Sequence, residues 1–116
     1  MTDAGQHVDI AALNELRQIM GDEFSTLIET FQNDSVIRIQ TIEDAVSGGD
    51  PEQIRRAAHS FKGSASNMGA IQLADLCRRM EELGHSGTAD GCDVLYKQIL
   101  AEYDNVRVSL AFLQEQ

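Results

Sequence analysis

The segment AHSFKGSASNMGA, residues 58–70, places a histidine, a lysine and a glycine within five positions. His59 could act as a nucleophile, because a neutral imidazole has a free nitrogen lone pair near pH 7. Lys62 lies about one helical turn away and could attract an anionic group to His59. Gly63 is unexpected in a helix, where alanine would be more stable by roughly 1 kcal/mol. We infer that its missing side chain gives another molecule access to the imidazole.

These residues lie on the polar side of the helix that the segment predicts. At about 100° per residue, the apolar positions fall opposite His59: Ile54, Ala57, Phe61, Ala65 and Met68. The residues on its own side are Arg55, Lys62, Gly63 and Ser66. His59 is therefore predicted to point away from the core.

Positive charge is concentrated in the same region of an acidic chain. The sequence has 9 basic and 19 acidic residues, with a formal net charge of −10. Five of the basic residues lie between positions 55 and 79, namely Arg55, Arg56, Lys62, Arg78 and Arg79. We expect a local basic surface that favours an anionic group at His59. The overall charge argues against nucleic acid and anionic membranes as partners.

The elements that position these residues are predicted to be helices throughout, which indicates an all-α fold. The predicted helices span residues 10–20, about 22–46, 51 to 67 or 68, about 70–83, and from between 88 and 93 to 113. Asp9 and Asp50-Pro51 are typical helix starts, and Gly84 is expected to end the fourth helix. Four long helices with short connections predict an up-and-down antiparallel four-helix bundle, with the short N-terminal helix covering one end. We expect a single domain over residues 1–116.

Composition also suggests where the protein works. No apolar run approaches the roughly 18 residues needed to span a bilayer, and the N-terminus lacks the features of a signal peptide. We therefore expect a cytoplasmic protein. Cys77 and Cys92 lie on helical patterns without C-x-x-C spacing, so we expect small core residues rather than a disulfide or a zinc site.

The longer segment AHSFKGSASNMGAIQLADLCRRMEELG, residues 58–84, resembles the signature of histidine-containing phosphotransfer (Hpt) domains. The similarity includes the H-x-x-K-G-S core, the G-A after the helix and the L-x-x-x-C pattern that follows, so the signature helices cover about 51–84. The length is similar to that of stand-alone bacterial members, including the HptB type. The resemblance implies a phosphocarrier of a bacterial multistep phosphorelay, not an enzyme.

The resemblance also implies the partners and the reaction. His59 would accept a phosphoryl group from a receiver-domain aspartate of a hybrid sensor kinase and pass it to the receiver aspartate of a response regulator. Lys62 would supply positive charge for the phosphoryl oxygens, and Gly63 would give the partner access. No cofactor is expected on the isolated chain, and Mg²⁺ should belong to the receiver domain.

Other residues have weaker assignments under the same resemblance. Glu81 takes the position of a Gln or another hydrogen-bonding residue that orients the imidazole. Its carboxylate would also favour the cationic, non-nucleophilic ring, and it could equally be one more exposed acid. Arg55, Arg56 and Ser66 could contact the partner, whereas His85 stands where some relatives carry Arg.

Two other classes of protein remain as alternatives. A helical adaptor or inhibitor would bind its partner without phosphorylation of His59. A bundle metalloprotein would need inward-facing pairs of Glu and His. We do not expect a full histidine kinase, because the sequence is short and has no glycine-rich ATP-binding segment. We expect a monomer.

Overall fold

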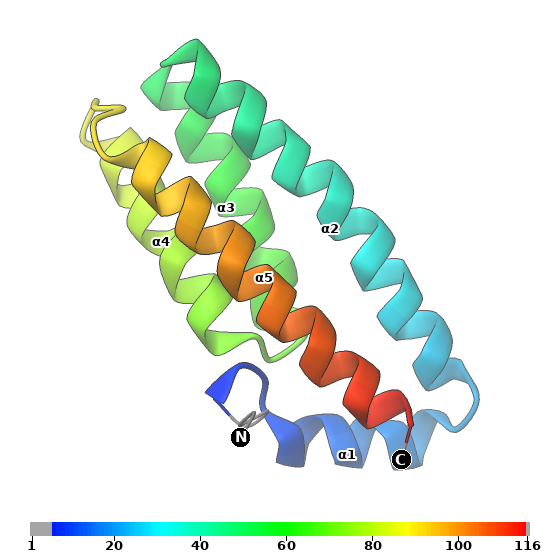
Figure 1. The fold of residues 1–116 in the computed structure, drawn as a ribbon. Coiled ribbons are helices and arrows are strands. Elements are labelled where there is room, and N and C mark those ends of the chain that lie inside the picture. Colours follow the sequence, from blue (N-terminus) through cyan, green and yellow to red (C-terminus); the bar gives the residue numbers. More distant parts are fainter. Residues whose placement is uncertain (1–5, 116) are drawn as a thin grey trace.

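The computed structural model describes residues 6–115, and these form five helices connected by short turns. They are α1 (Ile10–Met20), α2 (Glu23–Gly48), α3 (Pro51–Asn67), α4 (Ile71–His85) and α5 (Cys92–Gln114). The four longer helices run up and down beside one another, and α1 lies across the end of the bundle where the α3–α4 turn is found (Figure 1). The predicted all-α, up-and-down bundle with a short N-terminal helix is confirmed.

Local sequence signals set most of the helix ends. The Asp9 side chain accepts a hydrogen bond from the backbone N–H of Ala12 at 3.1 Å and caps α1. Asp50 caps α3 by accepting from the backbone N–H of Glu52 at 3.0 Å, and Pro51 occupies the first turn. Gly49 ends α2 in the left-handed conformation, with φ of 67°. These caps fix where α3, the helix that carries His59, begins.

Gly84 has a different role from the predicted one. Helix α4 continues to His85, so the prediction that Gly84 ends it is wrong. Gly84 is buried, and a Cβ atom there would lie 2.6 Å from the carbonyl oxygen of Pro51 and 2.8 Å from the backbone nitrogen of Arg55. The glycine therefore lets α4 approach the first turns of α3 closely, and α3 and α4 are the most closely packed pair of helices.

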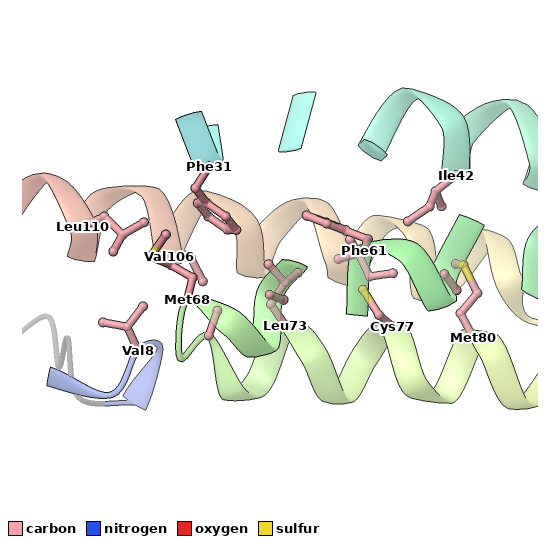
Figure 2. Packing of buried hydrophobic residues seen from close by; sticks show 14 of the residues in the cluster. Val8, Phe31, Ile42, Phe61, Met68, Leu73, Cys77, Met80, Val106 and Leu110 are labelled. Atoms are coloured by element: carbon pink, nitrogen blue, oxygen red, sulfur yellow. The ribbon is translucent and has the colours of Figure 1, made fainter. Parts of the chain in front are cut away.

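The core lies between the four long helices, and the predicted apolar face of α3 points into it. Phe61, Met68 and Cys77 are among the side chains that meet there (Figure 2). Cys77 and Cys92 are buried free thiols, as expected of core residues. Burial raises the pKa of Cys77 to about 12, so it remains an uncharged thiol at neutral pH.

The segment before α1 is attached to the end of the bundle. Val8 is fully buried beside the core, and the backbone N–H of Asp9 donates to the carbonyl of Gly69 at 2.9 Å. Gly69 has φ of 71°, which fits the predicted turn residue between α3 and α4. His7 Nδ1 lies 2.8 Å from Glu102 Oε2 on α5. These contacts hold the segment before α1 against the α3–α4 turn and against α5.

Among residues 6–115, no helix combines the length and the apolar character that crossing a bilayer requires.

Candidate functional site

His59 lies near the middle of α3 and points away from the core, as the helical wheel predicts. Its side chain is 63% exposed. The close packing of α4 on α3 brings Glu81 beside it, so that His59 Nδ1 lies 2.7 Å from Glu81 Oε2. The other carboxylate oxygen, Oε1, lies 2.7 Å from Nζ of Lys62. One carboxylate thus holds two side chains of the neighbouring helix.

The charge of Glu81 fixes the proton on the imidazole. Partial burial alone would raise the pKa of Glu81, but hydrogen bonds from Lys62 and His59 outweigh it and leave the pKa below its ordinary value. Glu81 is therefore ionised at neutral pH and can only accept hydrogen bonds. Nδ1 of His59 must be the donor, which leaves the lone pair of the neutral ring on Nε2. The site presents Nε2 as the reactive nitrogen.

The space beside His59 is open at Gly63. A Cβ atom built at this position would have no neighbouring atom within 4 Å. The glycine is therefore not required for close packing of helices, in contrast to Gly84. The missing side chain keeps the surface next to the imidazole low, and access for a partner stays a prediction.

The basic residues near the site are paired with acids, and these ion pairs were not predicted from the sequence. Arg55 and Arg56 both contact Glu52, at 2.7 and 3.2 Å. Arg78 and Arg79 both contact Asp75, at 2.8 and 3.1 Å. Acids within four residues on the same helix therefore offset much of the positive charge that was expected of this surface. Lys62 is the basic side chain that shares a carboxylate with His59.

Ser66 is exposed on the same helix, on the side of His59. Ser64 is half-buried and lines a hollow between α2 and α3 together with Phe31 and Met68.

The far end of α4 carries one acid and one histidine at a spacing that some bundle metal sites use. Glu82 and His85 have E-x-x-H spacing, but both are exposed and Glu82 pairs with Arg78 at 2.6 Å. Within residues 6–115, no three His, Cys, Asp or Glu side chains are grouped to hold a metal ion.

A groove between α2 and α3 includes Ser60, the residue after His59, and was not predicted from the sequence. Its lining includes Ile37 and Arg38 of α2, together with Ala57 and Ser60 of α3. Arg38 donates a hydrogen bond to Ser60, the residue after His59. Ile37 is 67% exposed although it is a large apolar residue. Ile37 lies outside the apolar stripe of α2 in the sequence, and this position could have identified it as an exposed apolar residue.

Comparisons with known proteins identify relatives of this chain. The sequence model of the Hpt domain family matches residues 26–109. The chain is 33% identical over 78 residues to the sensor protein TorS of Escherichia coli (strain K12), which covers 66% of this chain and 8% of TorS. It is 28% identical over 102 residues to histidine-containing phosphotransfer protein 4 of Arabidopsis thaliana, covering 83% and 80% of the two chains.

A solved structure is also similar over nearly the whole length. The crystal structure of histidine-containing phosphotransfer protein B (HptB) from Pseudomonas aeruginosa PAO1 has a TM-score of 0.87 and 36% sequence identity, and the match covers 94% of this chain and 95% of that one. The resemblance to the HptB type is therefore supported. With most of its length matched by the family model and an exposed histidine at the signature position, the chain belongs to the Hpt domain family.

Proposed function

We propose that His59 is the phosphoryl acceptor of this histidine phosphotransfer domain and that receiver domains are its partners. The proposal rests on the exposure of the His59 ring and on the hydrogen bond that this ring makes. The ring is exposed, its Nδ1–H is bound by Glu81, and Nε2 is left with a lone pair beside the open surface at Gly63. A nucleophile held in this way is positioned to attack a phosphoryl donor that is aligned in line with Nε2.

The proposed reaction runs between an aspartyl phosphate and the imidazole. Nε2 of His59 attacks phosphorus, the N–P bond forms, and the O–P bond to the donor aspartate breaks to release its carboxylate. The reverse step places the group on the aspartate of a second receiver. Lys62 contributes positive charge near the phosphoryl oxygens. The chain acts as a carrier and depends on a donor in trans.

Mg²⁺ is proposed to come with the receiver domain. This ion prefers several oxygen ligands in a near-octahedral arrangement. Glu81 is the carboxylate that contacts His59, and hydrogen bonds from His59 and Lys62 already occupy its two oxygens. The proposed division of labour gives the nucleophile to this chain and the metal to its partner.

We propose that the receiver covers the groove between α2 and α3 as well as His59. Ile37 offers an exposed apolar contact on the α2 side of the groove, and Ser60, the residue after His59, lines the α3 side. An interface centred here would bring the partner's aspartate to Nε2 over the open surface at Gly63.

Transfer of label from a phosphorylated receiver tests the function. The parent should gain label, His59→Gln should gain none, and His85→Gln should behave like the parent because His85 is exposed and outside the site. Label that appears in His59→Gln would overturn the assignment. Retention of the pathway's output by His59→Gln would instead favour an adaptor.

A further inference from the structure

The two hydrogen bonds to Glu81 require a carboxylate. One oxygen accepts from the imidazole of His59 and the other accepts from the ammonium of Lys62, both at 2.7 Å. A glutamine of the same shape has one acceptor oxygen and one NH₂ donor, so it could not accept from both. The negative charge at this position therefore has consequences that a neutral hydrogen-bonding residue would not have.

These consequences appear after phosphorylation. Attack by Nε2 leaves the proton on Nδ1, so the phosphorylated ring is an imidazolium unless it loses that proton. When the N–P bond of the protonated ring breaks, the leaving group is neutral imidazole. The deprotonated ring would have to leave as an anion, which is a much poorer leaving group. An adjacent carboxylate favours the protonated form.

We propose that Glu81 keeps Nδ1 of phosphorylated His59 protonated and thereby holds the phosphoryl group in a readily transferable, short-lived state. The inference rests on the proposed function of His59. During transfer the N–P bond forms as the donor's O–P bond breaks, and the proton stays on Nδ1. Onward transfer reverses these changes at a second aspartate, so neither step exchanges a proton with solvent. Lys62 moves from Glu81 to the new phosphoryl oxygens.

Other charged groups around the ring do not replace Glu81. On α3, Lys62 and Arg55 are cations and oppose protonation of the ring, and Glu52 is engaged by Arg55. On α4, Cys77 is an uncharged thiol near Glu81. His85 lies one turn beyond Glu81 and is exposed. On α2, Arg38 is paired with Asp34. In the described part of the chain, Glu81 is the carboxylate in contact with the imidazole.

The test compares the lifetime of phosphorylated His59 in the parent, Glu81→Gln and Glu82→Gln. Phosphoramidate, a small phosphoryl donor, phosphorylates the purified proteins without a receiver, and His59→Gln identifies the signal of His59. Phosphorus NMR then follows hydrolysis between pH 6 and 9. Glu82 is a matched control because it lies on the same helix and pairs with Arg78.

Glu81→Gln should lengthen the lifetime at pH 8 by about three- to tenfold. It should also move the pH at which hydrolysis slows downward by roughly one unit, which a merely structural role would not do. Glu82→Gln should match the parent. In the parent, the nitrogen-15 chemical shift of phosphorylated His59 should show a protonated Nδ1 at pH 8, and this measurement does not depend on the folding of a variant.

Two results would overturn the inference. One is an unchanged lifetime and pH profile in a folded Glu81→Gln protein, and the other is a deprotonated Nδ1 in the phosphorylated parent at pH 8. If the parent takes label on His59 but either result is found, only the inference fails. If neither phosphoramidate nor a receiver phosphorylates His59, the proposed function fails and the inference falls with it.

Discussion

At the scale of single residues, substitutions of Gly63 can distinguish effects on the stability of α3 from effects on the access of a partner to His59. Gly63→Ala should stabilise the protein by up to roughly 1 kcal/mol, because alanine favours helix and a Cβ atom here meets nothing within 4 Å. Gly63→Gln should change stability little but should slow transfer, because its side chain occupies the space beside the imidazole. Thermal melts and transfer rates for both variants check this. Transfer by Gly63→Gln at the parent rate would show that access is not its role.

The sequence identifies some residues of the site and not others. The position of His59, Lys62 and Gly63 on one face follows from helical periodicity over five positions, which depends only on local geometry. Glu81 contacts both His59 and Lys62 because of the register in which α4 packs against α3. Glu81 and His59 are 22 positions apart in the sequence, so local pattern does not determine this register. The pairing of the arginines with acids likewise depends on side-chain conformations that composition does not specify.

At the scale of helices, Gly84 sets how closely α4 approaches α3. Gly84→Ala should destabilise the protein by roughly 1–3 kcal/mol, because its Cβ atom would lie 2.6 Å from a backbone oxygen that cannot easily move. Urea unfolding measures the difference, and Gly63→Ala is the matched control with the opposite expected sign. A Gly84→Ala protein as stable as the parent would contradict the close approach of the helices.

Receiver binding should depend on the groove between α2 and α3. Ile37→Ser should weaken receiver binding by about fivefold, which corresponds to roughly 1 kcal/mol of lost apolar contact. Val94→Ser removes a comparably exposed apolar side chain from α5 and should leave binding unchanged. Calorimetric titration of a receiver into each protein gives the affinities. Equal affinities for the two variants would place the receiver elsewhere.

Helix boundaries were predictable where a nearby side chain caps the helix. They were not predictable where a glycine could either end a helix or permit close contact with another helix. Asp9 and Asp50 begin helices because their side chains accept from backbone groups two or three residues away. Gly84 near the end of an apolar pattern resembles a helix-ending glycine, yet here it permits contact with Pro51. Sequence alone does not distinguish these roles, since the second one depends on a neighbouring helix.

At the scale of the whole molecule, the paired carboxylates predict loss of stability in acid. Hydrogen bonds from Arg78 and Arg79 lower the pKa of Asp75. Hydrogen bonds from Arg55 and Arg56 lower the pKa of Glu52 to about 2, although desolvation of the carboxylate opposes this shift. Because these pKa values are lower in the folded chain, the unfolded chain binds more protons as the pH falls. Their stabilisation is full above the ordinary values near 4 and is lost toward pH 2. Below the pI of about 4.5, growing positive charge adds repulsion.

The melting temperature should therefore decrease steadily from about pH 4.5 to about pH 2. Circular dichroism melts across this range provide the measurement. The same series in high salt should show a smaller decrease, since salt screens both the exposed ion pairs and the repulsion between exposed charges. A melting temperature that stays constant over the range would contradict the contribution of the carboxylates.

The bundle itself was predictable, because four apolar stripes separated by short turns leave few other ways to bury them. The attachment of the N-terminal segment was not. Glu102 looks like one more acid in an acidic chain, yet it is buried beside His7 and helps to hold the segment before α1 against α5. Contacts between positions so distant in sequence follow from the assembled bundle and not from local pattern.

The most direct test of the central claim is to map the phosphoryl group after transfer from a phosphorylated receiver. The protein is digested at alkaline pH, and the modified residue is located by mass spectrometry alongside His59→Gln. We expect a base-stable, acid-labile phosphoryl group on His59 alone. Label on His7 or His85, or an acid-stable label on another residue, would contradict it.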